Sequence, residues 1–348
     1  MTQFPPMQNP GPINLPAPLR LDAVKQWLSR TIGTDGFSIE PASSDASFRR
    51  YYRVTHQGAS QIVMDAPPSH ENCRPFVKVA QLFYDLGLHV PRVLEADLEN
   101  GFLLLDDLGP TLYLSVLSAA NASQLYGDAT ASLIKLHRSG KQDLAPYDHK
   151  KLHTEMSLFP QWFMAQHLQI SPEPYRDLLN KSFEQLSTSA LAQPIVAVHL
   201  DFHSRNLTHL PEKNPGILDF QDAVMGPITY DLASLYRDCY IRWPTTQVEQ
   251  WVQDYSLRLK AEGLIDAAQQ GQFQQWFDMM GAQRHLKAVG IFARLNHRDG
   301  KPGYLKDIPR TLNYITEVCE RYDALKEFGH FIRQVIHPAM LQKGMALL

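Results

Sequence analysis

Two carboxylates and an amide stand at a spacing that could carry chemistry. Asn206 follows Asp201 by five residues, and Asp219 comes at the end of the short apolar run Ile217-Leu218. Transfer of a phosphoryl group from ATP needs a carboxylate that orients the accepting hydroxyl. It also needs an amide and a second carboxylate that hold Mg²⁺ on the phosphates. The pattern therefore predicts a kinase, with Asp201 as the base and with Asn206 and Asp219 as magnesium ligands.

The alternative is that these are turn and cap residues that share the spacing by chance. Two observations favour a catalytic role. His199 precedes Asp201 after an apolar lead-in, and Asp219 would end a buried strand, where a carboxylate is costly unless it meets a cation. Arg205 lies in the same loop, where it could neutralise the transferring phosphoryl group or the region around Asp201.

The composition argues against a nucleic-acid partner and against a membrane protein. The chain has 348 residues and a formal net charge of −3, and no apolar run approaches the length of a membrane span. Its three cysteines are far apart and form no CxxC pair, which is typical of reduced thiols in a cytoplasmic protein. Residues 1–18 are rich in proline and lack the features of a signal peptide, so we expect a disordered arm.

The spacing of apolar residues divides the rest of the chain into two parts. Before a polar break at 106–110, it predicts helices over 19–33 and 71–86 and strands over 48–55, 60–65, 90–96 and 101–105. After the break it predicts mostly helices, over 123–136, 152–170, 174–187 and from 231 onward, interrupted by two short strands around a polar loop in 195–220. We therefore expect an α+β lobe at 19–108 and a mainly helical, catalytic lobe at 109–348.

The motif His-x-Asp-x-x-x-x-Asn, formed here by His199, Asp201 and Asn206, resembles the catalytic loop of the aminoglycoside phosphotransferase and choline kinase-like superfamily. The resemblance implies an α+β, protein kinase-like fold with two lobes: a small N-lobe with an antiparallel sheet, and a mainly helical C-lobe. It implies ATP and Mg²⁺ as cofactors, with Asp219 on the metal-binding strand. His199 and Asp231 would brace the catalytic loop, although Asp231 could instead be a helix N-cap.

The small lobe shows the same resemblance. Residues 43–54 are similar to the hairpin that covers the nucleotide in this superfamily, with serines in place of a glycine-rich loop. The residues expected to contact the nucleotide are Ser43, Ser44, Ser47 and Arg50 in this hairpin, and Asp106 and Leu108 in the hinge that follows. An ordinary Ser/Asp turn is the alternative reading of 43–47.

One departure from the superfamily concerns the third strand, which usually carries a lysine that pairs with the phosphates. The corresponding stretch, 61–68, contains no lysine or arginine. The phosphate cation would then come from elsewhere, with Arg49, Arg50, Arg53, Arg74 and Lys78 as candidates. A nucleotide-binding pseudokinase is the alternative that this absence supports.

Several longer strings are similar to the bacterial anomeric amino-sugar kinases, among them 48–53, 64–68, 101–109 and 218–223. The similarity extends over most of the chain. Those enzymes use ATP to phosphorylate the C1 hydroxyl of N-acetylmuramate and N-acetylglucosamine in cell-wall recycling. The resemblance implies a small amino-sugar substrate, and we expect a cytoplasmic monomer with no nucleic-acid or membrane partner.

Basic residues in the C-terminal half suit an anionic acceptor. Residues 281–310 contain seven lysines and arginines against two aspartates, and Arg294 and Arg298 could share a helix face. Arg242 and Trp243 follow the loop and could bind a sugar through a guanidinium and an aromatic ring. The alternatives are a solvated helix face for the arginines and a core position for Trp243. An aminoglycoside kinase or a small-alcohol kinase would need an acidic or aromatic pocket instead.

Overall fold

The structure, a computed structural model, describes residues 17–44 and 48–346; of residues 17, 18, 43 and 44 it describes the backbone alone. Residues 1–16 of the predicted arm and Ser47 thus lie outside the described residues. The chain forms two compact units, which are described separately. The first comprises the described residues up to Pro110 together with Gly216–Asp222, and the second comprises Thr111–Pro215 and Ala223–Leu348 as far as they are described.

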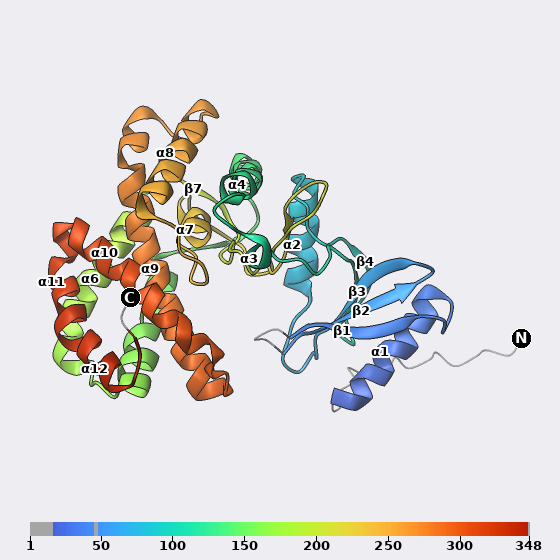
Figure 1. The fold of residues 1–348 in the computed structure, drawn as a ribbon. Helices are drawn as coiled ribbons and strands as arrows, with labels where there is room; N and C mark the ends of the chain where they lie inside the picture. The colour runs from blue at the N-terminus through green and yellow to red at the C-terminus, as the bar shows by residue number, and fades with distance from the viewer. Residues whose placement is uncertain (1–16, 45–47, 347–348) are drawn as a thin grey trace, which may run out of the picture. The chain divides into compact units, whose positions relative to one another are not determined.

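The first unit is built on an antiparallel sheet of five strands in the order β1-β2-β3-β5-β4 (Figure 1). The strands are β1 Ser38–Ser44, β2 Arg50–His56, β3 Ala59–Asp65, β4 Val93–Asp97 and β5 Phe102–Asp106; the short strand β9 is Gly216–Ile217. Four of these five strands lie close to the predicted ones. The first strand, β1, was not predicted as a strand of its own, and it pairs with β2 across a register shift between Pro41 and Ser43.

The turns explain why the strands pair as hairpins. Between β2 and β3, Gln57 and Gly58 both have positive φ, 49° and 78°, as a tight two-residue turn requires. Before β5, Gly101 has φ 75°, and a Cβ there would lie 1.9 Å from the carbonyl oxygen of Ala66. The sharp reversal at Gly101 therefore needs glycine both for its backbone conformation and for the close approach of the neighbouring chain.

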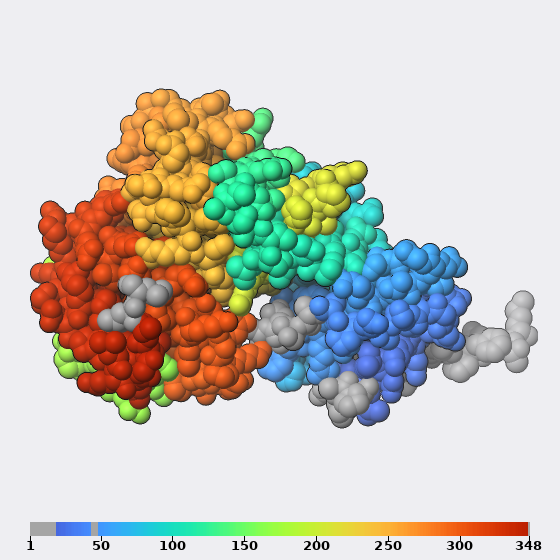
Figure 2. Space-filling model, in the orientation of Figure 1, coloured from blue at the N-terminus to red at the C-terminus, as the bar shows by residue number. Residues whose placement is uncertain are grey.

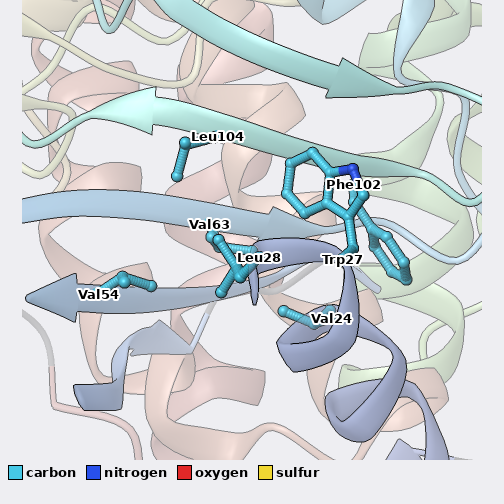
Figure 3. Close-up of a cluster of buried hydrophobic side chains, with 7 residues drawn as sticks. All are labelled: Val24, Trp27, Leu28, Val54, Val63, Phe102 and Leu104. Atoms are coloured by element: carbon cyan, nitrogen blue, oxygen red, sulfur yellow. The ribbon is translucent and has the colours of Figure 1, made fainter. Parts of the chain in front are cut away.

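Helix α1, Ala17–Ile32, packs on one face of this sheet (Figure 3). Its Val24, Trp27 and Leu28 form one buried cluster with side chains of three strands, Val54, Val63, Phe102 and Leu104. Arg20 on the same helix donates from Nε to the buried carboxylate of Asp65 at 2.8 Å. Gly33, with φ 80°, ends the helix as predicted.

The remaining elements of the first unit are helix α2, Arg74–Asp85, and the segment Gly216–Asp222. Phe220 is fully buried, and its ring centroid lies 4.8 Å from that of Phe76 and 5.9 Å from that of Phe83. The N–H of Ile217 donates to the carbonyl oxygen of His89 at 2.8 Å. These contacts fix the position of Asp219 within the first unit, although it is distant in sequence from the rest.

The second unit is mainly helical. Its helices are α3 Tyr113–Val116, α4 Ala122–Arg138, α5 His149–Met156, the π-helix η1 Phe159–Leu168, η2 Glu173–Tyr175, α6 Arg176–Leu191, α7 Tyr230–Tyr236, α8 Thr245–Ala261, α9 Ala267–Asp299, η3 Pro302–Asp307, α10 Ile308–Arg321, η4 Asp323–Leu325, α11 Lys326–Phe331, η5 Ile332–Ile336 and α12 His337–Gln342. The C-terminal helices, orange to red, form one continuous surface in Figure 2. No helix within the described residues is both long and apolar enough to cross a bilayer.

Short strands frame the loop of the second unit that carries the predicted catalytic residues. Strand β10, Val224–Pro227, pairs antiparallel with β7, Ile195–Val198, and parallel with β6, Ala145–Pro146. Strand β8 is Leu207–Thr208. The loop 199–206 thus begins where β7 ends and finishes where β8 begins, so that both of its ends are held by strands.

One helix prediction in this unit is wrong. The helix expected over 152–170 consists of two elements, α5 and the π-helix η1, with residues 157 and 158 between them. Pro160 lies in the first turn of η1, where its missing N–H leaves no backbone donor unsatisfied. The apolar spacing continues through both elements, and this is why the pattern indicated a single helix.

Candidate active site

The catalytic-loop residues are held by bonds within the loop. The N–H of His203 donates to the carbonyl oxygen of Asp201 at 3.0 Å, and Nδ2 of Asn206 donates to the same oxygen at 3.0 Å. Because the amide nitrogen of Asn206 is the donor in this bond, its oxygen is the atom that can bind a cation. The ring Nδ1 of His199 accepts the N–H of Asp201 at 3.2 Å.

Asp231 binds the beginning of the loop. Its fully buried carboxylate accepts the N–H of His199 at 2.7 Å and that of Leu200 at 3.0 Å. Leu200 has φ 78°, a left-handed conformation that is unfavourable for a leucine and that these bonds stabilise. Burial raises the pKa of Asp231 to about 7, and the two N–H groups oppose this rise. The carboxylate lies inside the first turn of α7 and bonds to the loop, as a brace would.

Two cations from α9, Arg284 and Lys287, act electrostatically on Asp201. Burial by itself would raise the pKa of Asp201, but Lys287, His203, Arg284 and His199 act on the carboxylate and hold its pKa below the usual value. Lys287 is fixed in turn, since its Nζ lies 3.2 Å from Oε1 of Glu155 and 3.1 Å from the hydroxyl of Tyr230. Asp201 is therefore an ionised carboxylate at neutral pH, able to accept a hydrogen bond from a substrate hydroxyl.

Arg284 and Lys287 were not among the predicted site residues. Both belong to α9 and are spaced i and i+3, so they share a helix face. Arg284 is buried, and the Lys287 side chain is nearly buried. Lysine and arginine on a helix are usually exposed to solvent, so we did not expect these two residues in the site. Basic residues that fall on the apolar side of a long helix are the sequence signal that could have found them.

Arg205 lies against aromatic side chains. Its guanidinium carbon is 3.7 Å from the ring centroid of Tyr240 and 5.6 Å from that of Tyr304. Phe292 stacks on Tyr304 at 5.7 Å. The buried carboxylate of Asp238 accepts the N–H of Ser204 at 2.9 Å and that of Tyr240 at 2.8 Å. It thus joins the loop to Tyr240, the residue whose ring lies against Arg205. Tyr240, Tyr304 and Asp238 were not predicted as site residues.

The other predicted acceptor residues are engaged elsewhere in the second unit. The Trp243 ring is 8% exposed and packs edge-on against Tyr126 and Trp251, and its N–H donates to the hydroxyl of Tyr126 at 2.8 Å. These contacts are those of a core residue, which was the alternative reading. Arg242 forms an ion pair with Glu317.

Arg294 and Arg298 do share a face of α9, but their surroundings differ. Arg298 is exposed and forms a two-point ion pair with Asp299, at 2.7 and 2.9 Å. Burial and the neighbouring Arg298 charge lower the pKa of Arg294. The Arg294 Nε is buried and, among the described residues, has no hydrogen-bond partner.

The first unit contains the second carboxylate. Asp219 has φ 63°, accepts a bond from Nε2 of Gln221 at 2.8 Å and lies 3.9 Å from Nη1 of Arg49. Arg49 also lies 3.3 Å from the carboxylate of Glu71. Among the candidate phosphate cations, the structure therefore brings Arg49 to Asp219. Asn206 and Asp219 offer amide and carboxylate oxygens, the donors that Mg²⁺ prefers, and so fit that ion chemically.

The predicted nucleotide contacts also belong to the first unit. Asp106 ends β5 and binds Arg92 through two bonds, at 2.6 and 3.3 Å, while Leu108 is buried. Arg50 begins β2 and lies 3.9 Å from the Asp65 carboxylate. Ser43 and Ser44 belong to β1, where the structure describes only their backbone, and Ser47 lies outside the described residues.

A separate cluster of possible metal ligands lies on the second unit. His149 and His153 of α5 stack at 4.2 Å, and Glu184 of α6 lies 2.9 Å from Nε2 of His149 and 3.4 Å from Nε2 of His153. The His149 bond lowers the pKa of Glu184, as expected for a histidine–carboxylate pair between two packed helices. This contact joins α5, which carries Glu155, to α6.

The architecture of the two units is that of the protein kinase-like fold. A choline kinase from Cryptosporidium parvum has a similar structure, with a TM-score of 0.63 and 10% identity over 86% of this chain and 97% of that chain. An ethanolamine kinase from Plasmodium vivax has a TM-score of 0.61 and 12% identity over 88% and 89% of the two chains. At these identities the likeness concerns the fold alone.

Sequence comparison then defines the family. The model of the phosphotransferase enzyme family matches residues 38–268. A protein from Pseudomonas putida named N-acetylmuramate/N-acetylglucosamine kinase is 46% identical, over 86% of this chain and 88% of its own length. Proteins of the same name from Pseudomonas aeruginosa and Neisseria meningitidis are 47% and 39% identical, over 84% and 92% of this chain and 87% and 97% of their own lengths. This chain belongs to the phosphotransferase enzyme family and is a phosphotransferase with a hydroxyl acceptor.

Proposed function

We propose that this protein is an ATP- and Mg²⁺-dependent kinase that phosphorylates the anomeric C1 hydroxyl of N-acetylmuramate and N-acetylglucosamine. The product would be the sugar 1-phosphate, and the role would be cell-wall recycling in the cytoplasm, with the protein acting as a monomer. The observation that carries the proposal is the ionised Asp201 in a loop braced by Asp231, in a chain 46% identical to a kinase of that name.

In this proposal Asp201 acts on the acceptor. Its carboxylate accepts a hydrogen bond from the C1 hydroxyl and takes the proton as the sugar oxygen attacks the γ-phosphorus of ATP. The new bond joins that oxygen to phosphorus, the bond to the bridging oxygen of ADP breaks, and ADP leaves with its electron pair. The cations around Asp201 keep it ionised and so able to take the proton. Catalysis is then mainly positioning and charge stabilisation.

The remaining residues would bind the nucleotide. Asn206 and Asp219 would hold Mg²⁺, which when bound neutralises charge on the phosphates. The phosphates would be contacted by Ser43, Ser44, Ser47 and Arg50. The adenine base would be contacted by the hinge residues Asp106 and Leu108. Arg49, close to both Asp219 and Glu71, takes the role of the absent lysine in this proposal.

The charge around Asp201 supports an acceptor that is not a polycation. Arg284 and Lys287 both act on the Asp201 carboxylate, and Arg205 belongs to the same loop. A polycationic aminoglycoside would be repelled by these groups, whereas a neutral or anionic sugar would not. These cations favour the amino sugars over an antibiotic, and Arg294 and Arg298 of α9 are proposed as further contacts to the sugar.

The test measures ADP release with Mg-ATP and four acceptors: N-acetylmuramate, N-acetylglucosamine, kanamycin and choline. We expect turnover with the two amino sugars only, and ³¹P NMR coupling to the anomeric proton in the product. Asp201→Asn should lower kcat by at least about a hundredfold while ADP binding persists. Asp177→Asn, at an exposed site on α6, is the matched control. Turnover of kanamycin or choline alone, or full activity of Asp201→Asn, would contradict the proposal.

A further inference from the structure

Arg205 lacks the close ion pairs that two nearby cations, Lys287 and Arg310, make. Lys287 is paired with Glu155, and Arg310 with Asp307. Arg205 makes ring contacts with Tyr240 and Tyr304, and no carboxylate in the part of the chain that the structure describes lies within ion-pair distance of it. A half-buried guanidinium without an acceptor is unfavourable, since each of its donors then lacks the bond it would make with water.

The aromatic contacts determine which atoms of Arg205 can bind a ligand. At 3.7 Å from the Tyr240 centroid, the guanidinium lies over the face of the ring, so the ring occupies one flat side of the group. Its N–H donors point outward in the guanidinium plane, where a planar acceptor can meet two of them at once. Tyr240 is itself held by Asp238 through the backbone, so the group is pre-organised rather than mobile.

The local charge favours an anion. Asp307 is nearly buried, and although burial raises its pKa, Arg310, Arg205 and Lys306 all act on its carboxylate. Three cations thus act on one carboxylate, and that carboxylate is bonded to Arg310 at 3.1 Å. An incoming carboxylate would meet a positive field and two parallel donors, the arrangement in which arginine binds carboxylates best.

The two sugars of the proposed function differ in this respect. N-acetylmuramate carries a lactyl ether that ends in a carboxylate, and N-acetylglucosamine has a hydroxyl at that position. We propose that Arg205, held against Tyr240 and Tyr304, binds the carboxylate of the acceptor sugar and gives the enzyme its preference for N-acetylmuramate. The inference rests on the proposed function and extends it to the recognition of the acceptor.

The competing role for Arg205 is neutralisation of the transferring phosphoryl group. The two roles make different predictions. The phosphoryl group is transferred in the reactions of both sugars, whereas the carboxylate is present only in N-acetylmuramate. A substrate-binding role changes KM for one sugar, and a phosphoryl role lowers kcat for both.

The experiment compares kcat and KM for both sugars in the wild type, Arg205→Gln and Arg205→Lys. We expect Arg205→Gln to lower kcat/KM for N-acetylmuramate by about tenfold to a hundredfold, mainly through KM, and to change that for N-acetylglucosamine by less than about threefold. Arg205→Lys should recover part of the loss, because lysine restores the positive charge but not the two parallel N–H donors of the guanidinium. Tyr304→Leu, which removes one ring, should reduce the same preference. Arg138→Gln, an exposed arginine bonded to Glu262, is the matched control.

The outcomes separate the two proposals. Equal losses of kcat with both sugars would overturn the carboxylate role and leave the kinase assignment intact. A wild type that does not distinguish the sugars would do the same. Absence of turnover with both sugars in the wild type would overturn the proposed function, and this inference with it. Thermal unfolding of each variant identifies a loss that comes from misfolding, and Tyr304→Leu then provides the independent test.

Discussion

At the residue scale, the charge state of Asp201 depends on a cation from a helix more than 80 residues away in the sequence. Lys287 is the first of the groups that lower the pKa of Asp201 against the effect of burial. A carboxylate with a lowered pKa stays ionised to lower pH, so in the proposed mechanism the base would be active across a wider acidic range. The proposal therefore predicts that α9 partly sets the pH profile of the enzyme.

We expect Lys287→Met to raise the pKa of Asp201, because removal of the cation disfavours the charged carboxylate. The acid limb of kcat/KM should move to higher pH by about one unit or more, since a neighbouring opposite charge typically shifts a carboxyl pKa by 1–3 units. The measurement is kcat/KM for N-acetylglucosamine from pH 3 to 8. Lys287→Arg, which keeps the charge, is the control. An unchanged acid limb in Lys287→Met would show that Asp201 is not the titrating base.

Several candidate site residues that the sequence predicted from spacing along the chain do lie close together in the structure. His199, Asp201, Asn206 and Asp231 are drawn together by one loop and one helix turn, so their pattern is visible locally. Arg284, Lys287, Tyr240 and Tyr304 reach the site through tertiary packing, which no local pattern records. For the same reason the sequence could not distinguish Trp243 as a core residue from Trp243 as a sugar contact.

At the element scale, two helices of the second unit approach each other closely at Gly290. This residue lies in the second half of α9 and faces the start of the π-helix η1, where a Cβ would come within 2.4 Å of the carbonyl carbon of Leu158. The obstacle is backbone, which cannot rotate away as a side chain can. The small size of Gly290 thus permits α9 to pack on η1.

We expect Gly290→Ala to lower the free energy of unfolding by about 1–3 kcal/mol, the usual effect of overpacking. Gly271→Ala is the matched control, since it lies on the same helix with no atom within 4 Å of the added Cβ. That substitution should be neutral or should raise stability by up to about 1 kcal/mol, because alanine favours a helix more than glycine does. Urea denaturation measures both. Equal effects of the two substitutions would mean that α9 and η1 can separate without loss.

The elements that the sequence predicted well have local signals. The β2–β3 hairpin is marked by Gln57-Gly58, and α1 by its apolar face and by Gly33. The break between α5 and η1 was missed, because the apolar spacing runs through it. Strand β1 was missed as well, since its Pro41 and polar residues lack the alternation of a strand and its pairing depends on β2.

At the scale of the whole molecule, Gly216–Asp222 completes the first unit. Its anchor is Phe220, fully buried against Phe76 and Phe83. The polar break at 106–110 indicated where the continuous part of that unit ends. Nothing in the sequence indicated that a later segment belongs with it, because that assignment rests on contacts between residues more than 120 positions apart.

We expect Phe220→Ala to destabilise the first unit by about 3–5 kcal/mol, as removal of a buried phenyl ring from a core generally does. Hydrogen exchange should show the loss as faster exchange in α2 and β5. Phe48→Ala, at a site 61% exposed in the same unit, is the control and should change stability by less than about 0.5 kcal/mol. If the two substitutions had equal effects, the segment would not be an integral part of this unit.

The late position of Phe220 in the chain also bears on how the protein is made. A ribosome adds about 5–20 residues per second, so residues 111–215 occupy it for roughly 5–20 s after the first part of the N-terminal unit has been synthesised. Throughout that interval the nascent chain lacks Phe220, and Phe76 and Phe83 have no partner from this segment. The first unit therefore cannot finish folding until Asp222 has been made, and until then its unfinished apolar surface is open to chaperones.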